Sequence, residues 1–178
     1  MPAYHSGTVD QAALRRWRLD RVRAQLRARD YAGILLYDPL NIRYASDSCN
    51  MQLWTTHNAA RYCFIATDGP VVMFDFHGCG HLSADIETVD EVRGATSWFF
   101  FLGGPESENR AERWAGEIAD LVYQHGGENR RLAVDKCDPL GTFALSRRGI
   151  ELKDGQEVME LARARAREAA EPLLQKAG

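Results

Sequence analysis

Alternating apolar and polar stretches divide the chain into a series of helices and strands. Helical spacing predicts helices at residues 11–29, 105–126 and 138–149 and from residue 156 onward. Short apolar runs predict strands at residues 33–37, 61–67, 70–76, 89–93, 96–102, 131–135 and 150–153. Short helical turns are expected at residues 41–44 and 82–88. Because Asp68-Gly69 adds a hairpin to this alternation, the order predicts an α/β fold: a mixed β-sheet with helices on both faces.

Two of these segments show a clear apolar face. The first helix places Leu19, Val22 and Leu26 on one side. The helix over residues 105–126 carries a longer apolar stripe, made of Ala111, Trp114, Ile118, Leu121 and Val122. The run of four aromatic residues at 98–101 is too apolar for an exposed edge, so it is expected to be a buried part of a strand.

A polar and aromatic loop is expected between residues 46 and 60, and it is long for a compact domain. Trp54 and His57 offer an indole and an imidazole, and Arg61 closes the segment. These groups can line a pocket for a small polar or anionic ligand, with Arg61 holding a carboxylate through two parallel hydrogen bonds. The alternative is an ordinary ordered loop followed by a surface arginine.

Composition and charge narrow the class of protein. The chain has 178 residues, of which 26% are charged, and a net charge of −3, which argues against nucleic acid as a partner. No apolar run is long enough to span a membrane, and the first residues do not resemble a secretory signal. The four cysteines are scattered without a C-x-x-C pair, so free thiols and a cytoplasmic location are expected.

Catalytic signatures are mostly absent. No phosphate-binding glycine loop, nucleophile elbow or H-E-x-x-H motif occurs. The most metal-like patch is His77, Cys79 and His81, but its spacing fits no standard zinc site and its glycines favour an ordinary turn. A nucleophile pair of Cys49 with His57 would need the fold to bring the two together. The sequence therefore assigns neither a catalytic residue nor a metal site to this chain.

Three elements together resemble a known family. Residues 38–44, Asp-Pro-Leu-Asn-Ile-Arg-Tyr, follow the first strand. Arg61-Tyr62 opens a strand that leads through Asp68-Gly69-Pro70 into the next one, and Asp154-Gly155 follows the last strand. The chain resembles the N-terminal domain of creatinase and prolidase-type enzymes, the pita-bread metallohydrolases. Residues 50–54, Asn-Met-Gln-Leu-Trp, are most similar to a branch that includes dimethylsulfoniopropionate lyases and Xaa-Pro dipeptidase-like proteins.

The resemblance implies a fold with a ribonuclease H-like motif and a homodimer in which this domain lends residues to the partner subunit's active site. It places divalent metal ions in a C-terminal catalytic domain, whose ligands, two Asp, one His and two Glu, this sequence lacks. By analogy with creatinases, Arg61 would contact the substrate carboxylate, and Trp54 and His57 would shape the pocket. One departure is Asp47, which follows Ser46 near a position where the family usually has glycine.

The sequence thus predicts a tail at residues 1–10, a creatinase/prolidase-type N-terminal domain at 11–155 and a helical linker at 156–178. The expected function is non-catalytic: dimerisation, and binding of a small-molecule or dipeptide substrate within the full enzyme. Two rival hypotheses remain. One is a stand-alone module that binds a small anion through the 46–61 segment. The other is a small enzyme with a metal at His77, Cys79 and His81.

Overall fold

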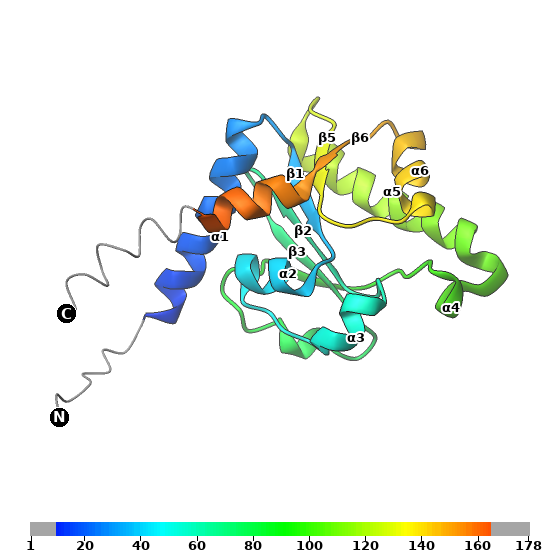
Figure 1. The fold of residues 1–178 in the computed structure, drawn as a ribbon, viewed down its shortest axis with the longest axis horizontal. Helices are drawn as coiled ribbons and strands as arrows, with labels where there is room; N and C mark the ends of the chain where they lie inside the picture. The colour runs from blue at the N-terminus through cyan, green and yellow to red at the C-terminus, as the bar shows by residue number, and fades with distance from the viewer. Residues whose placement is uncertain (1–9, 165–178) are drawn as a thin grey trace.

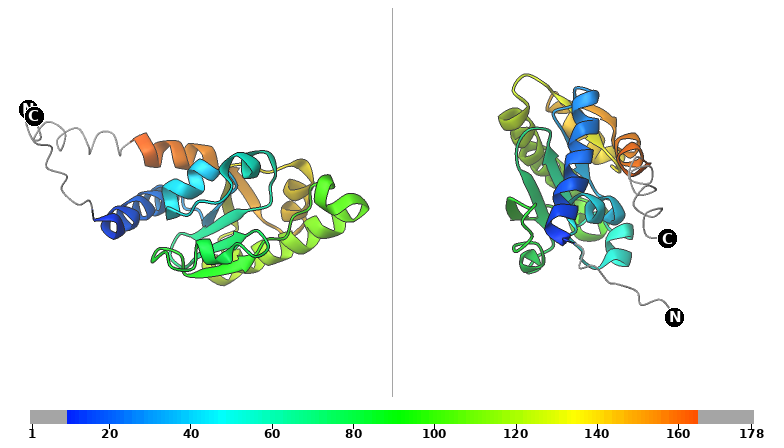
Figure 2. Two further views of the ribbon diagram at one scale, coloured as in Figure 1. Left: turned by 90° about the horizontal axis from the view of Figure 1, so that it is seen from below. Right: turned by 90° about the vertical axis from the view of Figure 1, so that its left-hand side faces the viewer.

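A computed structural model describes residues 10–164 and shows a mixed six-stranded sheet between two layers of helices (Figures 1 and 2). The strands are β1 (Gly33–Leu36), β2 (Tyr62–Ala66), β3 (Val71–Asp75), β4 (Glu91–Gly94), β5 (Arg131–Val134) and β6 (Glu151–Asp154). The helices are α1 (Gln11–Ala28), α2 (Pro39–Ser46), α3 (Gln52–His57), α4 (Phe100–Gly103), α5 (Ser107–Gly126), α6 (Pro139–Arg147) and a last helix at residues 155–164, with short 3-10 turns η1 (Gly80–Leu82) and η2 (Gly104–Glu106). The predicted fold class is confirmed.

The sheet has the order β4-β3-β2-β1-β5-β6. Strands β1, β2 and β3 pair antiparallel, and the Asp68-Gly69 hairpin joins β2 to β3 as predicted. The β3–β4, β1–β5 and β5–β6 pairs are parallel. Strands β1 and β5 therefore end at the same edge of the sheet, side by side.

Both faces of the central strands are buried because a helical layer covers each of them. On one face, α5 and α6 pack over Leu35, Phe64 and Leu132. On the other, α1, α2 and the last helix pack over Ile34, Ile65 and Ala133. The predicted stripe of α5 and the Leu19 face of α1 lie in these two cores. The last helix adds Val158, Met159 and Ala162 to the second core, and its continuation past residue 164 lies outside the described residues.

The predicted strand at residues 96–102 is wrong. Thr96 lies in an irregular segment, where its N–H donates to the Tyr62 hydroxyl, and residues 100–103 form the short helix α4. Trp98 is buried as expected, but Phe100 and Phe101 are 76% and 77% exposed. Residues 96–99 leave the sheet because Trp98 packs against Trp114 of α5 and donates its indole N–H to Asp138, so β4 remains the edge strand.

Two further expectations need correction. Residues 46–60 are not one loop, because α3 lies inside them. The helix expected at residues 82–88 is replaced by the single 3-10 turn η1 and the turns after it. Ser83, just after η1, is buried and bonded to polar groups of neighbouring elements, which holds this segment out of a regular helix.

Gly155, at the start of the last helix, is required by close packing. A Cβ atom there would lie 2.5 Å from the Val134 carbonyl carbon and 2.6 Å from the Asp135 amide nitrogen. We expect Gly155→Ala to lower the free energy of unfolding by about 1–3 kcal/mol, because backbone cannot move aside cheaply. Gly116→Ala in α5 is the matched control: its nearest neighbours, the Arg148 guanidinium atoms, are 3.7 Å away. The control should gain about 0.5–1 kcal/mol in urea unfolding, and equal effects of the two substitutions would contradict the packing argument.

Candidate functional site

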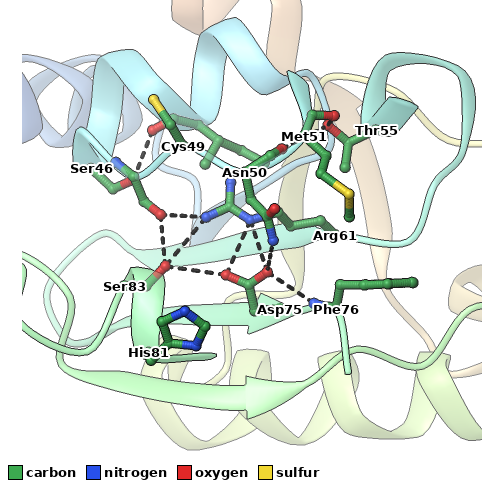
Figure 3. A network of polar contacts seen from close by, with 12 residues as sticks. Ser46, Cys49, Asn50, Met51, Thr55, Arg61, Asp75, Phe76, His81 and Ser83 are labelled. Atoms are coloured by element: carbon green, nitrogen blue, oxygen red, sulfur yellow. Dashed lines mark hydrogen bonds and ion pairs between the residues drawn. The ribbon is translucent and has the colours of Figure 1, made fainter. Parts of the chain in front are cut away.

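A buried ion pair lies beneath the 46–60 segment (Figure 3). Arg61 immediately precedes β2 and Asp75 ends β3, so the antiparallel pairing of these strands brings the two side chains together. The Arg61 Nε atom lies 3.2 Å from each carboxylate oxygen of Asp75. The two residues are only 2% and 1% exposed. A buried pair of this kind must be hydrogen-bonded throughout to repay its desolvation.

The carboxylate of Asp75 meets that requirement. It accepts hydrogen bonds from the Asn50 amide at 2.8 Å, the Ser83 hydroxyl at 3.2 Å and the Phe76 N–H at 2.9 Å. Asn50 belongs to the segment that precedes α3, and Ser83 follows η1. The single carboxylate therefore connects β3 to two irregular segments that are distant in sequence.

The guanidinium of Arg61 is less completely bonded. Its Nη2 atom donates to the hydroxyls of Ser48 and Ser83, which lie 2.6 Å from each other. Its Nη1 atom is buried and has no hydrogen-bond partner within residues 10–164. Nη1 is thus the one guanidinium nitrogen of Arg61 for which the described residues supply no acceptor.

The structure does not bring the three sequence-predicted residues into one cavity. Arg61 points into the domain interior. Trp54, on α3, packs its ring against Phe76, with ring centroids 5.1 Å apart. His57, the last residue of α3, is exposed and lines a separate cavity. Trp54 and His57 therefore share a helix, and Arg61 lies below it.

This separate cavity, which we name the His57 cavity, has a volume of about 300 Å³. Its wall is made of Tyr37, His57, Asn58, Ala59, Trp98, Phe99, Phe101, Lys136, Cys137 and Asp138. The Lys136 ammonium donates to the Thr56 carbonyl at 2.8 Å, and the Asp138 carboxylate accepts from the Trp98 indole at 2.9 Å. Burial raises the pKa of the Cys137 thiol to about 11, so this thiol stays protonated at neutral pH.

Sequence reasoning missed Lys136 and Asp138, although a signal for them existed. Both lie within four residues of the end of β5, and ligands of open α/β sheets often bind beyond the carboxyl ends of parallel strands. The strand predicted at residues 131–135 would, by this preference, place a ligand near residues 136–138.

A larger groove of about 890 Å³ lies between α1, α2 and the last helix. Its charged lining is balanced, with Arg18, Arg43 and Arg163 facing Asp38, Asp47 and Glu160. Asn41 connects the groove to the sheet: its amide donates to Asp135 at 2.8 Å, and its oxygen accepts from Arg163. Burial raises the pKa of Asp135, while the bond from Asn41 opposes that rise. Asn41, the first residue of the Asn-Ile-Arg-Tyr element, thus connects the last helix to the end of β5.

The patch of His77, Cys79 and His81 has the form of a surface turn. His77 and His81 are exposed, and a ring nitrogen of His81 lies 3.1 Å from the Gly78 carbonyl oxygen. Across residues 10–164, no group of three or more His, Cys, Asp or Glu side chains is placed to hold a metal ion. All four cysteines are free thiols. None of the helices within residues 10–164 has the length and hydropathy to cross a bilayer.

Fold and site together define an α/β domain built on a mixed sheet, with polar clusters at its edges. Residues 18–165 match the model of the creatinase/prolidase N-terminal domain. The chain belongs to this family.

Curated relatives refine this placement. The chain is 45% identical over 154 residues to the dimethylsulfoniopropionate lyase DddP of Roseobacter denitrificans. It is 40% identical over 155 residues to the protein of the same name from Roseovarius nubinhibens. These matches cover 86% and 87% of this chain but only 34% and 35% of the relatives. The chain therefore spans about a third of the length of these relatives.

Solved structures share the fold at low sequence identity. An Xaa-Pro aminopeptidase structure from Streptococcus pyogenes superposes with a TM-score of 0.59 at 16% identity, covering 85% of this chain and 98% of the other. The N-terminal domain of the cytoplasmic peptidase PepQ from Mycobacterium tuberculosis H37Rv gives 0.54 at 14% identity, covering 82% and 97%. These likenesses concern the fold alone.

Proposed function

We propose that this chain acts as the non-catalytic N-terminal domain of a dimethylsulfoniopropionate lyase-type enzyme, where it contributes to dimerisation and to substrate binding at the partner subunit's active site. The observation that carries the proposal is the 45% identity to DddP across 86% of the chain. The low-identity peptidase structures support the fold but do not favour a peptide substrate.

The proposal assigns metal-assisted chemistry to the part of the enzyme that this chain does not span. The relatives are about three times as long as the matched segment, which covers 34% of DddP. The side chains of residues 10–164 do not fit a divalent metal ion, because they offer no group of three ligands. No step of the reaction is therefore assigned to them.

Within this function, α3 is the element that contacts substrate. Trp54 is half-buried against Phe76, and an indole face attracts a sulfonium group through its π electrons. His57 lies at the end of the same helix. For Arg61, contact between Nη1 and the substrate carboxylate requires the segments that cover it to move in the full enzyme, because this atom is buried. Nε and Nη2 would stay bonded to Asp75, Ser48 and Ser83.

A chimera tests the proposal. The matching segment of Roseobacter denitrificans DddP is replaced by this chain, and consumption of dimethylsulfoniopropionate is measured. We expect the chimera to remain active, and Trp54→Ala to raise KM about tenfold or more, as the loss of a desolvated cation–π contact would. Trp17→Ala, which removes a 38% exposed indole on α1, is the matched control and should leave KM unchanged.

Two results would contradict the proposal. The first is a folded chimera, with the oligomeric mass of native DddP, that consumes no dimethylsulfoniopropionate. The second is a Trp54→Ala chimera whose KM equals that of Trp17→Ala. A second chimera, carrying the N-terminal domain of a low-identity peptidase, shows whether activity depends on this sequence or only on its fold.

A further inference from the structure

The His57 cavity lies where the chain diverges to opposite sides of the sheet. Strands β1 and β5 are parallel neighbours, and their carboxyl ends lead into Tyr37 and Lys136. From β1 the chain continues toward β2 on one side, and from β5 it continues through α6 to β6 on the other. In open α/β sheets a crevice at such a switch point is the usual place for a ligand.

Aromatic rings form much of the cavity. Tyr37 and Trp98 are buried and meet edge to face, with ring centroids 5.8 Å apart. The rings of Phe99 and Phe101 are parallel within 4°, with centroids 6.2 Å apart. Phe101 is 77% exposed and lies on α4, which Figure 1 shows at one end of the molecule. Faces of this kind attract cations that carry no N–H groups, such as sulfonium and quaternary ammonium ions.

The charges in the wall are of opposite sign. The Lys136 ammonium uses one donor on the Thr56 carbonyl and keeps further N–H groups for an anion. The Asp138 carboxylate already accepts from the Trp98 indole and from the Gly141 N–H at 3.0 Å. Because these acceptor positions are occupied, we expect Asp138 to act on a ligand mainly through its negative charge rather than by accepting another hydrogen bond. A simple anion would be attracted by Lys136 and repelled by Asp138, whereas an onium cation needs no acceptor and is favoured by Asp138.

We propose that the His57 cavity binds a small zwitterion that carries a bulky onium cation and a carboxylate. The onium group lies against Phe101 and Trp98 near Asp138, and the carboxylate accepts from Lys136. A cavity of about 300 Å³ is large enough for a ligand of this size. The choice of dimethylsulfoniopropionate as the probe rests on the proposed function. The cavity is separate from the Arg61 cluster and from the Trp54 face that packs on Phe76.

Calorimetric titration of the intact 178-residue chain tests this inference. The probes are dimethylsulfoniopropionate and glycine betaine, compared with propionate and trimethylsulfonium, which each carry only one of the two charges. We expect both zwitterions to bind, and each half-molecule to bind at least about tenfold more weakly, because it lacks one set of contacts. Failure of both zwitterions to bind, or propionate binding as tightly as they do, would overturn the proposal.

Variants locate the site. Phe101→Ala should weaken binding about two- to fivefold, whereas Phe100→Ala should not, since Phe100 is equally exposed at 76% but does not line the cavity. Lys136→Met should weaken binding about tenfold, and Lys136→Arg should restore it, because charge rather than packing holds the carboxylate. Equal effects of Phe100→Ala and Phe101→Ala, or an unchanged affinity in Lys136→Met, would show that the ligand does not bind in the His57 cavity.

The chimera and the titration distinguish failure of the proposed function from failure of the cavity proposal. If the chimera consumes substrate but the isolated chain binds no zwitterion, the cavity proposal falls and the proposed function stands. If the chain binds zwitterions through Phe101 and Lys136 but the folded chimera is inactive, the cavity proposal stands and the proposed function falls.

Discussion

Asp75→Ala should lower the free energy of unfolding by about 3–5 kcal/mol, because it leaves the buried Arg61 guanidinium without its counter-ion. Arg61 is 2% exposed, so water cannot readily replace the lost carboxylate. The substitution also removes the acceptor for Asn50, Ser83 and the Phe76 N–H. Urea unfolding followed by circular dichroism measures the loss.

An exposed pair of the same residue types provides the control. Arg27 and Asp68 approach to 2.6 Å, yet their side chains are 52% and 71% exposed. Solvent screens such a pair, so Asp68→Ala should cost at most about 1 kcal/mol. If Asp75→Ala lowers the free energy of unfolding no more than Asp68→Ala does, burial does not strengthen the contribution of the Arg61–Asp75 pair to stability. The contrast separates burial from the mere presence of an ion pair.

The same cluster affects the proposed substrate contact. Asn50 connects the Asp75 carboxylate to the segment that leads into α3, the helix of Trp54. Met51, between them, has a left-handed backbone with φ of 34°, a conformation that its side chain alone does not favour. The Asp75 bond therefore helps to fix the start of α3. Under the proposed function, Arg61 and Asp75 would therefore contribute to the substrate contact by positioning α3.

Most of the fold could be predicted because its signals are local. The hairpin follows from Asp68-Gly69 between apolar runs, and α5 from its apolar stripe. The strand predicted at residues 96–102 failed because apolar character does not distinguish a buried strand from a segment with exposed rings. Trp98 is buried beneath α5, whereas Phe100 and Phe101 project outward from α4. That difference depends on where β4 ends the sheet, which no local pattern records.

The candidate site was predictable only in part, for the same reason. The sequence singled out Arg61 as a cation, but its partner Asp75 is 14 residues away, across a hairpin. Pairing of β2 with β3 decides that the two meet. Similarly, His57 and Lys136 share a cavity because β1 and β5 are neighbours, although 80 positions of sequence separate Lys136 from Thr56, the residue it bonds. Long-range strand order, rather than residue type, creates both arrangements.

Trp114→Ala should also cost about 3–5 kcal/mol, because truncating a fully buried indole leaves a cavity that the core cannot fill. Trp114 packs among other aromatic side chains of the core. Its ring centroid lies 4.1 Å from that of Trp98 and 6.5 Å from that of Tyr62. Trp17→Ala, at a 38% exposed indole on α1, should change the free energy of unfolding by about 0.5 kcal/mol or less.

Trp114 also supports Trp98, which forms part of the His57 cavity. A folded Trp114→Ala protein should therefore bind dimethylsulfoniopropionate more weakly than wild type at a temperature where both are native, whereas Trp17→Ala should not. Urea unfolding and calorimetric titration of the same samples measure the two effects. A stability loss near that of Trp17→Ala would show that the indole is replaceable in the core. Weakened stability with unchanged affinity would show that Trp98 keeps its position without Trp114.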